Sequence, residues 1–170
     1  MKFSVLLSLY HKENPTFFRE SLDSIFQQIL PPDEVVLVED GPLTPELYEV
    51  VDAFASHHPE MKVIALKENR GLGKALDEGL KHCSYELVAR MDTDDICKPE
   101  RFVRQVAFLE THPDIDVVGA WIDEFQENIT NIISTRRVPE FPENIRQFGK
   151  KRCPMNHPVV MLSLIHISEP

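Results

Sequence analysis

The sequence contains few cysteines, and their spacing suits neither a disulfide framework nor a zinc site. The three cysteines, Cys83, Cys97 and Cys153, are odd in number and far apart, and no two of them form a Cys-x-x-Cys pair. Disulfide frameworks and zinc sites both need cysteines grouped at suitable spacings. We therefore expect reduced thiols and a cytoplasmic protein.

Long hydrophobic runs and an excess of positive charge are also missing. The longest apolar runs, such as Val35–Val38, are far shorter than the roughly 20 apolar residues that cross a bilayer. The first residues enter a strand-like run at once and show no signal-peptide cleavage pattern. A formal net charge of −10 disfavours nucleic acid as a partner, because contacts to phosphates need a positive surface.

What the sequence does contain is a regular alternation of strand-like and helix-like segments. The strand-like segments are short, rich in β-branched residues and almost continuously apolar, which is typical of strands buried on both faces. They are Phe3–Tyr10, Glu34–Glu39, Lys62–Leu66, Glu86–Met91 and Asp116–Trp121. Helical periodicity follows Asn14-Pro15 and Thr44-Pro45, and further helices are predicted over Leu72–Cys83 and from near Pro99. This order predicts an α/β fold, with a mainly parallel sheet and helices on both faces.

The rhythm changes after Trp121. The segments Glu124–Gln126 and Ile129–Arg136 flank Glu127-Asn128, a pattern that predicts a β-hairpin on the edge of the sheet. Four prolines then arrive without a clear periodic segment, at positions 139, 142, 154 and 158. We interpret that stretch as an ordered connection along the sheet or as a linker.

Polar residues follow three of the predicted strands, at the edge where parallel sheets bind ligands. The segment Asp92–Asp95 follows the fourth strand, and Asp92 and Asp94 point to the same side of an extended backbone, roughly 6.5 Å apart. Converging carboxylates repel by roughly 3 kcal/mol at about 5 Å, and a hard divalent cation removes that cost. The spacing therefore suits Mg²⁺ or Mn²⁺ held together with a nucleotide diphosphate. A solvated acidic turn that caps the next helix would give the same pattern.

Two other strand ends carry candidate ligand-binding residues. Asp40, in Glu39–Pro42, is placed to accept hydrogen bonds from a base or ribose, or to form a local turn before Gly41. Arg70 and Lys74 follow the third strand, where each would either pair with a phosphate or remain an ordinary surface charge.

Five motifs occur in order between residues 3 and 161, and Pro99–Phe102 and Val117–Gly119 continue the pattern. They are Ser4–Tyr10, Ser21–Gln27, Glu39–Gly41, Asn69–Gly71 with Ala75, and Met91–Asp95. Together they resemble the family 2 glycosyltransferases of the GT-A fold, which is Rossmann-like. The resemblance is closest to bacterial members that build exopolysaccharide, capsule or lipopolysaccharide.

The resemblance implies a UDP-sugar donor and roles for individual residues. Asp40 would hold the base, with weaker contacts near Tyr10, and Glu39 stands where the family usually has aspartate. Asp92 would lie nearer the ribose and Asp94 on the metal, Mg²⁺ or Mn²⁺, while Arg70 would contact the nucleotide. The implied reaction is inverting transfer of a sugar to a saccharide or lipid-linked acceptor.

The end of the chain departs from the family pattern. The segment Met155–Pro158 resembles the one that leads into the acceptor half of these enzymes, whose general base lies further on. We therefore expect residues 1–161 to be a GT-A nucleotide-sugar-binding domain without its acceptor half, able to bind but not to transfer. Residues 162–170 are expected to be a non-native or disordered tail. His157 is either a hydrogen-bond donor near the diphosphate or a structural residue.

Two other functions stay open at this point. A nucleotidyltransferase that makes sugar nucleotides needs a glycine-rich basic loop after its first strand, and Tyr10–Pro15 contains no glycine. A non-catalytic domain that binds sugar nucleotides or another protein is the other alternative. Peripheral membrane contact is expected if the acceptor is lipid-linked, although no basic amphipathic segment is evident. The donor sugar, the acceptor and the oligomeric state are not indicated.

Overall fold

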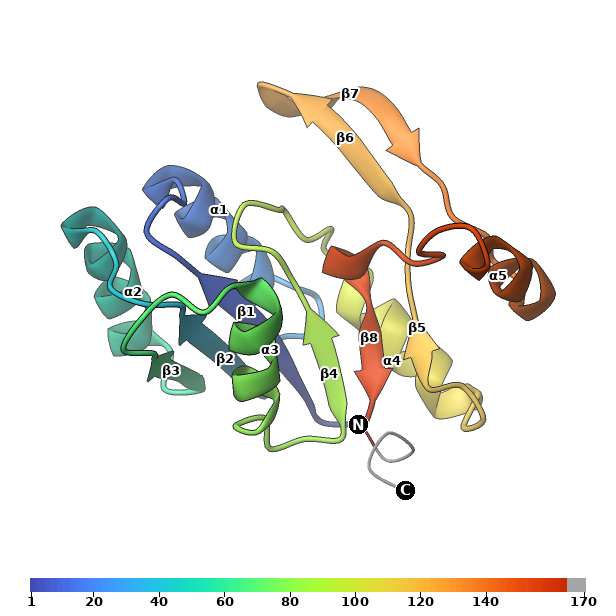
Figure 1. The fold of residues 1–170 in the computed structure, drawn as a ribbon, viewed down its shortest axis with the longest axis horizontal. Helices are drawn as coiled ribbons and strands as arrows, with labels where there is room; N and C mark the ends of the chain where they lie inside the picture. Colours follow the sequence, from blue (N-terminus) through green and yellow to red (C-terminus); the bar gives the residue numbers. More distant parts are fainter. Residues whose placement is uncertain (165–170) are drawn as a thin grey trace.

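The computed structural model of the protein describes residues 1–164, which form a six-stranded central sheet and a separate two-stranded sheet (Figure 1). In spatial order the central strands are β3 (Met61–Ala65), β2 (Glu34–Glu39), β1 (Phe3–Leu9), β4 (Leu87–Arg90), β8 (Met161–Ser163) and β5 (Val117–Val118). Strand β1 pairs in parallel with both β2 and β4, and β2 pairs in parallel with β3. Strand β8 runs antiparallel to its neighbours β4 and β5. The sheet is therefore mainly parallel, as predicted.

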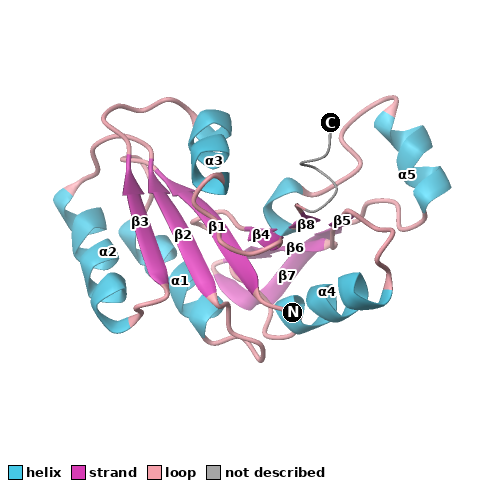
Figure 2. Ribbon diagram, turned by 90° about the horizontal axis from the view of Figure 1, so that it is seen from below, coloured by secondary structure: helices cyan, strands magenta, loops and turns pink. Residues whose placement is uncertain are grey.

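Helices cover both faces of the central sheet (Figure 2). They are α1 (Pro15–Phe26), α2 (Pro45–His57) and α4 (Arg101–Thr111) on one face and α3 (Leu72–Leu80) on the other. Side chains of a strand alternate between the two faces, so Leu37 packs in the core under α1, α2 and α4 while Val36 packs with Leu76 of α3. Double coverage explains the continuous apolar runs, and the predicted α/β class is confirmed.

The first two helices begin where the sequence predicts. The Asn14 side chain accepts hydrogen bonds from the backbone N–H groups of Thr16 (2.8 Å) and Phe17 (3.4 Å). Thr44 caps α2 by accepting from the N–H of Leu47 (3.4 Å). Each cap precedes a proline in the first turn, where the missing N–H costs no hydrogen bond. Helix α3 ends at Leu80, three residues before the predicted end.

The prediction that the hairpin lies on the edge of the sheet is wrong. Strands β6 (Ile122–Gln126) and β7 (Asn128–Arg136) pair only with each other and extend away from the central sheet (Figure 1). The single residue between them, Glu127, has a φ of 62°. The Trp121 Nε1–H donates to the carbonyl of Val138 (3.0 Å), which ties the base of the hairpin to the returning chain rather than to the sheet.

The proline-containing stretch also contains more regular structure than the sequence indicated. It includes helix α5 (Pro142–Gly149), a short 3₁₀ helix η1 (His157–Val159) and then β8. The sequence pattern hides α5 because the helix is only about two turns long and begins at a proline, which is tolerated only at a helix start. Strand β8 continues through Leu162 and Ser163, past the expected domain boundary, and residues 165–170 of the expected tail lie outside the described residues. Across residues 1–164, no helix is long and apolar enough to span a bilayer.

A buried carboxylate lies at the end of the sheet where β2 begins. Glu34 is 4% exposed, and its carboxylate accepts hydrogen bonds from Ser4 Oγ (2.5 Å) and from the N–H and Oγ–H of Ser84 (both 2.8 Å). It also forms an ion pair with Lys62. Burial alone raises the pKa of Glu34, but the Lys62 ammonium and these hydrogen bonds outweigh it and lower the pKa to about 2.

We expect Glu34→Gln to destabilise the fold in a pH-dependent way. Because the folded-state pKa lies below the unfolded one, the charged carboxylate stabilises the fold above about pH 5, and this contribution disappears as the pH falls toward 2. Urea unfolding should show a loss of roughly 2–3 kcal/mol at pH 7 and a much smaller one near pH 2. The exposed Asp77→Asn serves as the control. An equal loss at both pH values would contradict the assigned cause.

Candidate functional site

Asp40 lies at the end of β2 and holds the loop that follows β3. It is 2% exposed, and its two carboxylate oxygens accept hydrogen bonds from the backbone N–H groups of Arg70 (2.6 Å) and Gly71 (2.9 Å). The Asn69 side chain donates to the Asp40 carbonyl (3.2 Å). A carboxylate has about four lone-pair positions, so these two hydrogen bonds leave about two unused, on a side chain that is almost fully buried. The predicted contact to a base is compatible with this arrangement.

Glycine is required immediately after Asp40. Gly41 has a φ of +84°, and a Cβ atom on it would lie 2.5 Å from the backbone nitrogen of Asn69. The loop after β3 therefore packs directly against the backbone of the loop after β2. This close packing explains why the Glu39–Gly41 motif ends in glycine, which the sequence alone did not reveal.

A cluster of four acidic side chains lies at the neighbouring strand ends. Asp92, Asp94 and Asp95 follow β4, and Glu13 comes from the loop between β1 and α1. Burial, together with the charges of Asp92 and Asp94, raises the pKa of Asp95 to about 6. Burial and the same two charges also raise the pKa of Glu13. Sequence reasoning missed Glu13, although its place after the first strand is the signal that could have identified it.

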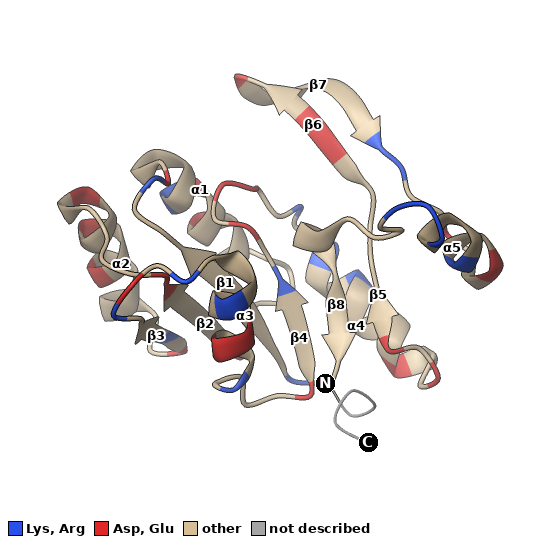
Figure 3. Ribbon diagram, viewed as in Figure 1, with Lys and Arg blue, Asp and Glu red and all other residues tan. Residues whose placement is uncertain are grey.

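One buried cation opposes this negative charge. Arg90, the last residue of β4, is 4% exposed, and its guanidinium forms an ion pair with Asp92. Figure 3 shows that the basic tip of β4 leads into an acidic loop. Residues two apart on an extended strand point to the same face, which brings the two side chains together. The Arg90 carbonyl accepts a hydrogen bond from Arg101 Nη2 (2.7 Å), so α4 helps to hold this position.

Helix α1 holds the acidic loop in place through polar side chains. Ser21 Oγ donates to the Asp92 carbonyl (3.1 Å), and Ser24 Oγ accepts from the N–H of Cys97 (2.9 Å). Gln28 Nε2 donates to the carbonyls of Cys97 (3.2 Å) and Lys98 (2.9 Å). The motif Ser21–Gln27 thus has a structural role, because its serines and the next residue position the loop that carries the carboxylates.

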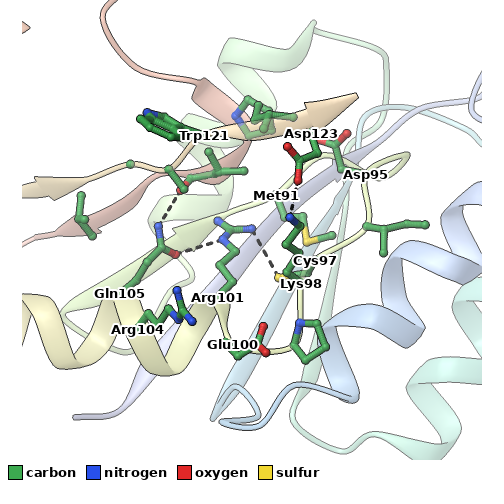
Figure 4. A pocket seen from close by; sticks show the side chains of 18 of the residues that line it. Met91, Asp95, Cys97, Lys98, Glu100, Arg101, Arg104, Gln105, Trp121 and Asp123 are labelled. Atoms are coloured by element: carbon green, nitrogen blue, oxygen red, sulfur yellow. Dashed lines mark hydrogen bonds and ion pairs between the residues drawn. The ribbon is translucent and has the colours of Figure 1, made fainter. Parts of the chain in front are cut away.

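A cavity of about 750 Å³ opens beside the acidic loop, between α4 and the β6–β7 hairpin (Figure 4). Met91 and Asp95 line it on the side of the loop, and Trp121 and Phe125 line it on the side of the hairpin. The Lys98 ammonium forms an ion pair with Asp123 of β6 and connects the two sides. The cavity thus provides mainly apolar space next to the carboxylates.

His157 lies close to the same charges. Burial and the Arg90 cation lower its pKa, whereas the charge of Asp92 acts in the opposite direction. The imidazole of His157, the first residue of η1, therefore lies within electrostatic reach of the Arg90–Asp92 pair. The structure thus brings His157, Glu13 and the carboxylates after β4 into one region.

The other residues predicted from the sequence are placed differently. Tyr10 is 36% exposed at the end of β1, and Glu39 is 6% exposed. Burial, followed by the charge of Asp52 on α2, raises the pKa of Glu39, so this carboxyl lies within electrostatic reach of α2. Arg70 is exposed, and it is its backbone that contacts Asp40. The nucleotide contacts of these residues stay predictions.

The carboxylates suit a divalent metal ion in chemistry but do not form a complete set of ligands. Oxygen donors are what Mg²⁺ and Mn²⁺ prefer. Among residues 1–164, however, no three Asp, Glu, His or Cys side chains are grouped so that they could hold an ion. The residues present therefore fit an ion that takes one or two carboxylate oxygens and completes its coordination with substrate and water.

Comparison with known proteins agrees with this arrangement. The sequence profile of the family described as "Glycosyl transferase family 2" matches residues 4–165, nearly the whole chain. The chain belongs to glycosyl transferase family 2. Its mainly parallel sheet, with acidic loops at the strand ends, is the GT-A architecture that the sequence predicted.

Bacterial relatives support membership of the family. The chain is 53% identical over 160 residues to an uncharacterized glycosyltransferase of Haemophilus influenzae. It is 44% identical over 159 residues to the amylovoran biosynthesis glycosyltransferase AmsE of Erwinia amylovora. It is 38% identical over 159 residues to the UDP-Gal:alpha-D-GlcNAc-diphosphoundecaprenol beta-1,3-galactosyltransferase of Escherichia coli. Each alignment covers 94% of this chain but only 57–60% of the relative.

Solved structures of glycosyltransferases share the fold. The mannosyltransferase PcManGT of Pyrobaculum calidifontis, in complex with GDP-Man and Mn²⁺, matches with a TM-score of 0.68 at 20% identity, covering 98% of this chain and 46% of that one. S. aureus TarS 1–349, in complex with UDP-GlcNAc, matches with a TM-score of 0.64 at 29% identity, covering 82% of this chain and 37% of that one. The chain thus spans less than half of these two structures.

Replacement of Gly41 tests the contact between the two loops. We expect Gly41→Ala to lower the free energy of unfolding by about 2 kcal/mol or more, because it adds a clash to a strained positive φ. Gly73→Ala is the matched control, since no atom lies within 4 Å of its added Cβ and alanine favours helix α3. Denaturant unfolding of both variants provides the measurement. Equal effects would mean that the two loops do not pack as described.

Replacement of Asp95 tests the cost of holding its charge in a partly buried position beside Asp92 and Asp94. Because the folded-state pKa of Asp95 is raised to about 6, stability falls as the pH rises from about 4 to 6. An asparagine side chain mimics the neutral acid, so Asp95→Asn should stabilise the fold by about 1–2 kcal/mol at pH 7.5 and have little effect near pH 4. The exposed Asp114→Asn should be neutral throughout. Thermal unfolding near pH 4 and at pH 7.5 provides the measurement. A lower stability of Asp95→Asn than of the wild type at pH 7.5 would contradict the prediction.

Proposed function

We propose that this chain is the donor-binding part of a metal-dependent, inverting glycosyltransferase. The donor is a UDP-sugar, and the acceptor is a saccharide or lipid-linked sugar in cell-surface polysaccharide synthesis. The observation that carries the proposal is the gathering of Asp92, Asp94, Asp95 and Glu13 beside the edge that holds Asp40, in a chain of this family. Relatives named for amylovoran biosynthesis and for UDP-Gal transfer support the substrate class.

The nucleotide would bind across the ends of β2, β1 and β4. Asp40 is rigidly held by the N–H groups of Arg70 and Gly71 and would accept hydrogen bonds from the base through its remaining lone pairs. Asp92 is oriented by Arg90 and would accept from the ribose. Fixing the two ends of the nucleoside in this way would place the diphosphate next to Asp94.

Asp94 and Asp92 would hold a divalent ion, Mg²⁺ or Mn²⁺. Such an ion supplies Lewis-acid stabilisation of the charge on a departing diphosphate. Arg90 pairs with Asp92 and offsets part of the repulsion between the carboxylates. Asp95, with a raised pKa, adds less negative charge near neutral pH than a surface aspartate would.

The acceptor would approach from the side of β4 that faces β8 and β5. The cavity beside Asp95 offers space there, and Trp121 presents an aromatic ring of the kind that packs against sugars. An inverting reaction needs a carboxylate that deprotonates the acceptor hydroxyl. We assign that base to no residue between 1 and 164. We therefore propose that this chain, at the cytoplasmic side of the membrane, binds donor without transferring sugar.

Titration calorimetry with UDP tests the proposal. We expect UDP to bind the folded chain in the presence of Mn²⁺ or Mg²⁺ and to bind at least about tenfold more weakly in EDTA. Asp94→Asn should remove most of the metal dependence, whereas Asp114→Asn should leave it intact. UDP binding of equal strength with and without metal, in folded protein, would refute the metal-dependent site.

A further inference from the structure

Positive charge is scarce in the chain but concentrated in one segment, residues 136–152. This segment contains six of the eighteen Lys and Arg residues and only two acidic residues, in a chain of net charge −10. The six cations are Arg136, Arg137, Arg146, Lys150, Lys151 and Arg152. In Figure 3, the blue of Lys and Arg gathers on α5 and the chain beside it, at the opposite end of the molecule from α2.

These cations are available to an external partner. All six are exposed, and none forms a salt bridge with another described residue. Two of them lie over aromatic rings, Arg137 over Trp121 (4.9 Å) and Arg152 over Phe148 (4.5 Å). Like charges without an ionic partner among residues 1–164 repel one another, and an anionic partner would relieve that repulsion.

Helix α5 has the residue pattern of a helix that lies at a membrane surface. None of its residues is buried. Phe141, Ile145 and Phe148 are spaced by four and three residues and therefore share one side of the helix. Phe141 is 63% exposed, whereas Ile145 and Phe148 are half-buried. A short apolar stripe flanked by cations is typical of helices that lie in the headgroup region of a bilayer.

The segment is presented on a fixed base next to the candidate site. Asn156, 4% exposed, donates from Nδ2 to the carbonyls of Ala120 (3.0 Å) and Arg136 (3.3 Å). These two hydrogen bonds tie the chain after α5 to the chain before it. The next residue is His157, which lies within electrostatic reach of Arg90 and Asp92. A surface bound by α5 would therefore lie close to the candidate site.

We propose that α5 and its flanking cations bind the surface of a bilayer that contains anionic phospholipids. The cations attract the headgroups, and Phe141 and its stripe enter the interface. The acidic remainder of the molecule is repelled by the same surface, which orients α5 toward it. The structure thus reveals a basic amphipathic segment where none was evident from the sequence. The surface is separate from the donor site and does not depend on donor binding.

Vesicle co-sedimentation with the whole 170-residue chain tests the proposal. Vesicles of phosphatidylcholine with roughly one third phosphatidylglycerol should bind the chain, and pure phosphatidylcholine should not. Binding should weaken as salt rises, because exposed charges are screened. The variant Lys150→Gln/Lys151→Gln/Arg152→Gln should bind about a hundredfold more weakly. Phe141→Ser should weaken binding severalfold while keeping the salt dependence.

The matched control removes three exposed cations elsewhere, Lys2→Gln/Lys67→Gln/Lys81→Gln, and has the same net charge as the first variant. It should bind vesicles as the wild type does, and circular dichroism should show all variants folded. Equal weakening in the control would overturn the proposal, as would equal binding to neutral vesicles. Binding to a single-stranded RNA oligonucleotide without binding to anionic vesicles at the same salt would overturn it as well. Loss of UDP binding alone would affect only the proposed function.

Discussion

The site depends on the parallel pairing of β1 with both β2 and β4. The carbonyl of Leu9 accepts the N–H of Asp40 (2.7 Å), and the carbonyl of Leu6 accepts the N–H of Met91 (3.1 Å). One central strand thus sets the positions at which two acidic loops begin. Because all three strands run in the same direction, their polar ends meet at a single edge. Without this pairing, Asp40 and Asp92 would be unrelated turn residues.

The gathered charge is unfavourable for the fold, and the surrounding structure limits that cost. Burial, together with repulsion from Asp92 and Asp94, raises the pKa values of Asp95 and Glu13, while the buried Arg90 pairs with Asp92. The large apolar core under α1, α2 and α4 supplies the stability that tolerates this strain. Groups with shifted pKa values are common at functional sites, because a ligand that relieves the repulsion between them gains binding energy.

The distribution of charge gives the molecule two neighbouring regions of opposite sign. Acidic loops gather at the ends of β2 and β4, whereas cations surround α5 beyond β5 (Figure 3). Asn156 and His157 join the two regions through a few residues of chain. A bilayer contact at α5 and a donor at the carboxylates would bring a membrane-borne acceptor and a water-soluble donor to the same side of the protein.

The sequence by itself determined the alternation of strands and helices from β1 to β5, the caps Asn14 and Thr44, and the position of Asp92 and Asp94 after a buried strand. These are local patterns, because cap geometry and strand burial are encoded within a few residues. Only the tertiary structure decided that β8 inserts between β4 and β5, that Glu13 joins the acidic cluster and that α5 is left uncovered. Each of these depends on contacts between residues far apart in the chain, or on their absence, and periodicity within one segment carries no information about them.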